Sequence, residues 1–234
     1  MTDVQPAPDG LPVGAPVEGS DAGVPGPGPL EGRFVRLVPV DPAAHAPGLF
    51  EATHGDPAAE AVWTYMPYGP FASVDAMRAW LSEIAPSTEP TFMTVLDRET
   101  GTALGVVSYL NIVPRDRRIE LGHIWYVPQA QRGRTNTDTV HVLLREAFDV
   151  LGDRRVEWKC DALNARSRAA AERLGFTFEG VFRQHMIVKG RNRDTAWFSM
   201  TDAEWPARRD AMERWLDAEP GSLSLRELTA ALRP

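Results

Sequence analysis

Cysteine is nearly absent from this 234-residue sequence, in which Cys160 is the single one. One thiol excludes an internal disulfide and a cysteine-rich metal site, so we expect no metal cofactor. Positive charge is also in short supply, because the formal net charge is -7 and the isoelectric point is near 5.3. A chain without a basic excess releases few counterions from a phosphate backbone, and this argues against a nucleic-acid-binding protein.

Long hydrophobic runs are missing as well. No apolar stretch approaches the length that spans a bilayer, and the first residues lack the basic-then-apolar pattern of a signal peptide. We therefore expect a cytoplasmic protein that does not bind membranes.

The first 29 residues have no aromatic side chain and carry seven Pro and six Gly. Such a composition buries too little apolar surface to offset chain entropy. We expect residues 1–29 to form a flexible or loosely docked tail, residues 30–217 to form one folded domain, and residues 218–234 to add an extension with a short helix.

The rest of the chain shows strand and helix patterns bounded by Pro, Gly and capping residues. Three strand patterns joined by short turns predict an antiparallel meander, and a later strand–helix–strand passage predicts a parallel pair. We expect an α/β (α+β) fold with a mixed, mostly antiparallel sheet of about seven strands flanked by helices. The expected strands span residues 33–40, 91–96, 103–111, 118–127, 155–163, 177–188 and 195–200, and the expected helices span residues 43–53, 73–85, 137–151, 165–174 and 205–216.

The stretch from the fourth expected strand into the following helix predicts a phosphate site. Pro128 prevents further strand pairing, and Thr135, Asn136 and Thr137 are each able to cap the helix. The unpaired N–H groups of such a turn and the helix dipole favour an anion, and Arg132 and Arg134 would add positive charge.

The motifs, taken together, resemble those of the GNAT acetyltransferase superfamily, and within it the branch of RimJ/RimL-type ribosomal-protein N-terminal acetyltransferases. The resemblance covers roughly residues 30–217. It rests on Glu-Leu-Gly-His-Ile-Trp-Tyr-Val-Pro at residues 120–128, the turn from Gln131 onward, Asn-Ala-Arg-Ser at residues 164–167, Arg-Leu-Gly-Phe at residues 173–176 and Glu-Gly at residues 179–180.

This resemblance implies that acetyl-CoA lies in a V-shaped opening where strands 118–127 and 155–163 diverge. The acetyl group would pass directly from CoA to a primary amine, so Cys160 would not be needed as a nucleophile. The implied cofactor-binding residues are Val127, Gln131, Arg132, Gly133, Arg134, Thr135, Asn136, Thr137, Asn164 and Ser167.

The turn departs from the family pattern at two positions, because Arg134 and Asn136 stand where small residues are usual. Their side chains either contact the phosphates or keep the cofactor out. We favour binding, since Gly133 is a flexible residue and the helix caps are in place. The alternative is a catalytically silent acyl-CoA-binding or regulatory module.

Ser167 matches the position whose hydroxyl protonates the leaving CoA thiolate in this branch. Its alternative role is that of a first-turn helix serine bonded to Asn164, and Asn164 itself is either a cofactor contact or an ordinary N-cap.

The base that deprotonates the amine is less clearly marked. The branch's usual glutamate position corresponds to Met186 here, which leaves Glu120, His123 and His185 as candidates in that order. Strand alternation puts Glu120 and His123 on opposite faces unless a bulge intervenes. A surface ion pair with Arg118 is the alternative for Glu120.

The acceptor is a small-molecule or peptide amine, and the net negative charge favours a cationic one. Aromatic residues in the irregular segment 56–71 either pack over the core or contact this substrate. The candidate substrate-binding residues are Trp63, Tyr65, Tyr68, Trp125 and His185. A homodimer is compatible with the sequence.

Overall fold

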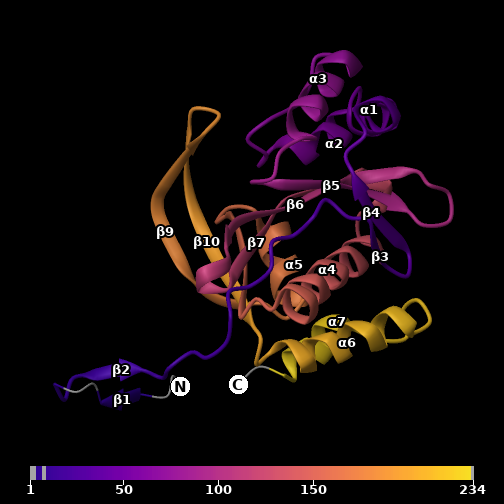
Figure 1. Cartoon of the computed structure of the whole chain (residues 1–234). Helices are drawn as coiled ribbons and strands as arrows, with labels where there is room; N and C mark the ends of the chain where they lie inside the picture. The colour runs from indigo at the N-terminus through magenta and orange to yellow at the C-terminus, as the bar shows by residue number, and fades with distance from the viewer. Residues whose placement is uncertain (1–3, 7–8, 233–234) are drawn as a thin grey trace.

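One mixed sheet organises the chain in the computed structural model, which describes residues 4–6 and 9–232. The eight strands of this sheet are ordered β3-β4-β5-β6-β7-β8-β10-β9, and Figure 1 shows helices on both of its sides. Only β7 and β8 run parallel, whereas the other neighbours are antiparallel. The strands are β3 (Leu30–Glu31), β4 (Val35–Pro39), β5 (Thr91–Asp97), β6 (Ala103–Val113), β7 (Arg118–Tyr126), β8 (Arg155–Asp161), β9 (Thr177–Val188) and β10 (Arg191–Thr201).

The helices fall into two groups. Helices α1 to α3 lie on one side of the sheet, and α4 to α7 lie on the other (Figure 1). Within the part of the chain that the structure describes, no helix is long and apolar enough to cross a membrane. The helices are α1 (Pro42–Thr53), α2 (Pro57–Glu60), α3 (Val74–Ile84), α4 (Thr135–Arg145), α5 (Ala165–Arg173), α6 (Trp205–Asp217) and α7 (Leu225–Ala230), with short 3₁₀ turns η1 (Ala61–Trp63), η2 (Pro114–Asp116) and η3 (Pro128–Ala130).

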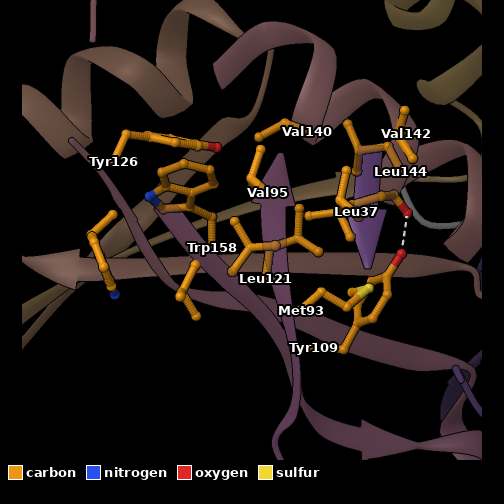
Figure 2. Close-up of a cluster of buried hydrophobic side chains, with 14 of the residues drawn as sticks. Leu37, Met93, Val95, Tyr109, Leu121, Tyr126, Val140, Val142, Leu144 and Trp158 are labelled. Atoms are coloured by element: carbon orange, nitrogen blue, oxygen red, sulfur yellow. Dashed lines mark hydrogen bonds between the residues drawn. The ribbon is translucent and has the colours of Figure 1, made fainter. Parts of the chain in front are cut away.

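The core extends over both faces of the sheet, and part of it lies between the sheet and α4. Figure 2 shows apolar side chains of the central strands meeting those of Val140, Val142 and Leu144 from α4. The fully buried Tyr109 donates its hydroxyl hydrogen to the carbonyl of Leu143 at 2.6 Å. Because a buried hydroxyl without a partner costs about 1–3 kcal/mol, this bond fixes how β6 packs against α4.

The predicted fold class is confirmed. The sheet has one strand more than expected because β3 is a two-residue strand, too short to leave an alternating pattern. The predicted helix 137–151 begins earlier, at Thr135, and continues after Arg145 as π-helical turns, η4 (Glu146–Leu151). The wider π turns keep the i, i+3 and i, i+4 apolar pattern, which is why periodicity alone does not reveal them.

The segment before the sheet has structure of its own. Strands β1 (Val4–Pro6) and β2 (Pro12–Gly14) pair as an antiparallel hairpin. Further on, the N–H of Ala22 donates to the carbonyl of Pro114 at 3.0 Å, and that of Gly23 donates to the carbonyl of Leu151 at 2.7 Å. The domain limits at residues 29 and 217 stay a prediction.

Two irregularities of β7 open the sheet beside β8. Parallel pairing runs from Arg118 opposite Arg155 to Leu121 opposite Trp158 and then stops. Just beyond, β7 carries one extra residue relative to β6, and His123 adopts a left-handed φ of 51°. A β-bulge of this kind bends a strand and increases its twist. Strand β7 therefore follows β6, while β8 follows β10 as far as Asp161.

Candidate active site

The turn between β7 and α4 presents unpaired backbone N–H groups beside the opening. The first intrahelical bond of α4 runs from the N–H of Asp138 to the carbonyl of Arg134 at 2.9 Å. The N–H groups of the first turn thus have no acceptor within the helix. The side chain of Gln131 braces the turn, since its Nε2 donates to the carbonyl of Tyr126 at 3.0 Å. Helix starts with unpaired N–H groups are a common place for anions to bind in proteins.

The predicted helix caps are wrong. Thr135, Asn136 and Thr137 are the first three residues of α4, and the capping position is Arg134, which makes no side-chain capping bond. The hydroxyl of Thr137 is turned inward and accepts a hydrogen bond from Arg173 Nη1 at 2.9 Å. The helix starts earlier than its polar residues suggested, and its first N–H groups therefore lack side-chain partners.

The guanidinium of Arg134 lies away from the turn. It stacks 4.8 Å from the ring centroid of Phe34 and donates to the carbonyl of Ala218. Arg134 could therefore contribute its backbone to a phosphate, but not this side chain as it stands. Arg132 and Gly133 are exposed, and a Cβ placed on Gly133 would meet nothing within 4 Å. The turn is consequently open to a ligand.

Arg173 of α5 is a charged neighbour of this turn that the sequence analysis missed. Besides donating to Thr137, its guanidinium lies 5.8 Å from the ring centroid of Trp215. Burial lowers its pKa, although the residue stays cationic near neutral pH. Its motif was recognised from the sequence, but only the packing of α5 against α4 shows that its charge supports the helix N-terminus.

Ser167 lies at the start of α5 with its hydroxyl beside β8. Its N–H donates to Asn164 Oδ1 at 3.1 Å, so the capping role predicted for Asn164 is confirmed. The indole Nε1 of Trp158 donates to Ser167 Oγ at 3.1 Å. With one lone pair occupied by that N–H, the hydroxyl hydrogen remains able to donate. Burial raises the pKa of the nearby Cys160 thiol, which disfavours a thiolate nucleophile.

Glu120 is buried, and its predicted surface ion pair with Arg118 is wrong. Its side chain is 1% exposed, and its Oε2 lies 3.0 Å from Lys159 Nζ and 2.6 Å from Asn111 Nδ2. Arg118 pairs instead with the neighbouring Glu157 at 3.6 Å. Desolvation raises the pKa of Glu120, although the Lys159 charge and both hydrogen bonds oppose the shift. A carboxylate with a raised pKa is a better proton acceptor.

The bulge decides where His123 lies. Its Nδ1 is 3.3 Å from the hydroxyl of Tyr68, and its ring stacks on that of Tyr68 at 5.7 Å between centroids. Desolvation and the charges of Lys159 and Arg193 lower the pKa of His123 to about 4. Lys159 thus acts on both Glu120 and His123, which regular strand alternation would have separated. His123 is neutral at pH 7.

The segment around Trp63 and the β9–β10 hairpin are distant in sequence but meet on the side of the sheet that carries Glu120 and His123. Lys189, at the tip of the β9–β10 hairpin, donates to the carbonyl of Trp63 at 2.9 Å. The hydroxyl of Tyr65 donates to the carbonyl of Leu163, after β8, at 3.2 Å. Trp63 is 1% exposed and packs on Trp125 at 4.7 Å between ring centroids. The buried Trp63 and Trp125 therefore pack beneath the residues that line this face, whereas Tyr65 lies at the edge of the face.

His185 lies on the same side of the sheet because β9 is irregular. Gln184 has a φ of 51°, and β9 carries extra residues between its pairs with Thr195 and Arg193 of β10. The ring of His185 lies 3.0 Å from Thr195 Oγ1 and 6.0 Å, between centroids, from Trp197. A regular strand would have turned it to the face opposite Met186. A cavity of about 950 Å³ is lined by Phe182, Arg183, Gln184, His185, Asn192 and Asp194.

The sequence and the fold are similar to those of known proteins. Residues 35–177 match the model of the acetyltransferase (GNAT) domain. A GCN5-related N-acetyltransferase from Brucella melitensis is 39% identical in sequence, covers 90% of this chain and 98% of its own, and superposes with a TM-score of 0.85. A GNAT-family protein from Chromobacterium violaceum is 40% identical over 84% of this chain and all of its own, with a TM-score of 0.75.

A curated relative, the "Putative ribosomal N-acetyltransferase YdaF" of Bacillus subtilis, is 30% identical over 105 residues. The alignment takes in 45% of this chain and 57% of the relative, so little more than half of the relative's length is matched. Its name agrees with the branch that the sequence motifs resemble. The family match extends over the parted strands, the turn before α4 and the start of α5, and the chain therefore belongs to the GNAT family of acetyltransferase enzymes.

Proposed function

We propose that the protein transfers the acetyl group of acetyl-CoA directly to a primary amine at the opening between β7 and β8. One observation carries this proposal. Trp158 and Lys159 are consecutive in β8 and so point to opposite faces of the sheet. Trp158 bonds Ser167 and Lys159 bonds Glu120, so a hydroxyl flanks the opening on one side and a carboxylate flanks it on the other.

The residues present fit acetyl-CoA. The first turn of α4, with Arg132 and Gly133 before it, would hold the diphosphate, because the N–H groups are unpaired and the guanidinium of Arg134 is directed elsewhere. The unpaired edge of β7 beyond Leu121 offers ladder positions to an amide-bearing arm. When bound, acetyl-CoA supplies the thioester that makes the acetyl group transferable. The departures at Arg134 and Asn136 therefore do not by themselves favour the silent module.

Glu120 is the residue we assign as the base. Lys159 and Asn111 hold its carboxylate in one orientation, and its raised pKa increases its affinity for the amine proton. Because Glu120 is 1% exposed, we expect the proton to reach it through a hydrogen-bonded relay rather than by direct contact with the amine. His123, neutral and bonded to Tyr68, is placed to position the acceptor.

Ser167 is the residue we assign to the leaving group. Trp158 and Asn164 fix its hydroxyl and its N–H, and the hydroxyl hydrogen, which lies within reach of the Cys160 thiol, would be donated to the CoA sulfur when acetyl-CoA is bound. This bond stabilises negative charge as it develops, and a positioned donor of this kind acts mainly in the transition state.

The acceptor itself is either a protein N-terminus, as the name of the Bacillus relative suggests for that protein, or a small-molecule amine. A cytoplasmic location, where acetyl-CoA is available, belongs to the same proposal.

The test combines two measurements on the full chain: the binding of acetyl-CoA by calorimetry, and the release of CoA with a panel of amines and ribosomal-protein N-terminal peptides. We expect both binding and turnover with at least one acceptor class. Binding without turnover on any amine would favour the silent acyl-CoA-binding module. Absence of binding would refute both readings.

A further inference from the structure

The Glu120 carboxylate beside the opening is already paired with a lysine. Glu120 Oε2 lies 3.0 Å from Lys159 Nζ, and the Glu120 side chain is shielded from bulk solvent. Lys159 is held in addition 5.4 Å from the ring centroid of Trp197. Glu120 therefore adds little net negative charge where the acceptor would lie.

Arg193 supplies an uncompensated positive charge on the same side. It stands on β10 two residues before Thr195 and four before Trp197, and alternation puts these three side chains on one face. Thr195 lies opposite Asp161 and Trp197 lies opposite Lys159, so Arg193 falls just beyond the end of β8, at the mouth of the opening.

The guanidinium of Arg193 has no partner among the described residues. Its Nε is buried and makes no hydrogen bond, and no ion pair is formed by its side chain within the described part of the chain. Two carboxylates close to it in the strand register bond to backbone N–H groups instead: Asp194 accepts from the N–H of Gln184 at 2.7 Å, and Asp161 accepts from the N–H of Leu163 at 2.8 Å. Arg155 of the neighbouring strand β8 is paired, by contrast, with Glu157 and Glu179.

The burial of Arg193 Nε without an acceptor is costly. A buried donor left without an acceptor typically costs about 1–3 kcal/mol, and such groups in folded proteins call for an explanation. Its position also agrees with an electrostatic effect on both strands, because the Arg193 charge lowers the pKa of His123 on β7 and of the Cys160 thiol on β8. A ligand acceptor at this point would remove the cost.

We propose that Arg193 binds an anionic group of the acceptor, so that the preferred substrate is a primary amine that also carries a carboxylate. The inference rests on the proposed acetyl transfer and defines its substrate class. A guanidinium suits this task because its planar fork pairs with both carboxylate oxygens. The contact outweighs the net charge of the chain, since charges separated by more than a Debye length of about 8–10 Å are largely screened. A cationic acceptor, favoured by net charge alone, would be repelled by Arg193.

The test assays amino acids and carboxyl-terminal dipeptides, each beside its carboxamide, with wild-type protein and with Arg193→Gln. We expect the variant to lose about tenfold or more in kcat/KM on carboxylates, mainly through KM, as one charge-assisted contact predicts, and to change about twofold or less on carboxamides. Comparing variant with wild type on each compound cancels the different pKa values of the amines. Arg193→Lys should restore part of the loss, because the charge returns without the fork.

Arg191→Gln is the matched control, because Arg191 lies on the same strand and is exposed. It should leave every ratio unchanged. Equal losses on carboxylates and carboxamides, or a preference for diamines, would overturn the role of Arg193 while acetyl transfer itself stands. A second readout covers a failure of turnover: calorimetric binding of the N-acetylated products should still distinguish wild type from Arg193→Gln for carboxylates only. Equal binding would overturn the proposal independently of activity.

Discussion

Replacing Glu120 by Gln tests the assignment of the base. The substitution keeps the shape of the side chain and removes the charge that faces Lys159 at 3.0 Å. Loss of a general base typically costs 10²–10⁴ in rate, so we expect kcat/KM to fall about 100-fold or more. The acid limb of the pH–rate profile, which reports the raised pKa of Glu120, should disappear with it.

The same change also affects stability, and its size can be worked from the structure. Removing one partner of a buried ion pair typically costs about 3–5 kcal/mol, and the partly exposed Lys159 side chain places this pair near the low end, about 3 kcal/mol. For a chain of this size the melting temperature falls about 2–4 °C per kcal/mol, which gives a decrease of about 9 °C.

Two further variants separate catalysis from stability. Glu157→Gln removes a carboxylate that lies opposite Glu120 in the parallel register but pairs with Arg155 and Arg118, and we expect kcat/KM within about threefold of wild type. Glu120→Gln combined with Lys159→Met should recover most of the stability, because the double variant leaves no unpaired charge at this site. Activity should stay low in that double variant.

The assay is CoA release measured from pH 5 to 9 beside thermal melting of each variant, with activity recorded well below the melting transition. Retention of both kcat and the acid limb in Glu120→Gln would refute the assignment of Glu120 as the base and would make His123 the next candidate. Equal losses in Glu120→Gln and Glu157→Gln would show that the effect is a general loss of charge on this face.

Three other expectations are independent of the base. Ser167→Ala should lower kcat by about tenfold or more, with acetyl-CoA affinity by calorimetry little changed, because the lost hydroxyl acts on the leaving sulfur; an unchanged kcat would remove Ser167 from the mechanism. Arg134→Ala should lower the melting temperature yet leave acetyl-CoA affinity within about threefold, because its guanidinium contacts Phe34 and Ala218. Arg132→Ala should weaken acetyl-CoA binding. A loss of affinity in Arg134→Ala but not in Arg132→Ala would show that the Arg134 guanidinium turns to the phosphates. Asp153 is buried beside Arg117, and burial raises its pKa to about 6, so its contribution to stability is present below its unfolded pKa and is lost as pH rises through 6. Asp153→Asn should therefore raise the melting temperature at about pH 8 by about 3 °C, after allowance for solvent screening, and much less at about pH 4.5; an equal gain at both would refute this.

The sequence by itself determined the fold and predicted where the site would lie. Periods of two and of three to four residues mark the strands and helices, because one face of each is buried against the core. Pro128 prevents β7 from continuing. A strand–helix–strand connection is almost always right-handed, and this predicts that β8 lies parallel to β7, next to the turn that precedes α4. The ordered motifs from residue 120 to residue 180 then identified the family.

The tertiary structure alone decided which side chains meet. Glu120 pairs with Lys159 rather than Arg118 because β8 is its neighbour in space, and a register across strands is not encoded in local spacing. The bulges at His123 and Gln184 place two histidines where regular alternation does not predict them, since inserted residues interrupt the alternation of side chains along a strand. The polar residues at 135–137 proved to be helical residues rather than caps. The Arg134 guanidinium packs on the ring of Phe34, which is distant in sequence. The unpaired charge of Arg193 is likewise visible only once every carboxylate near it has been assigned a partner.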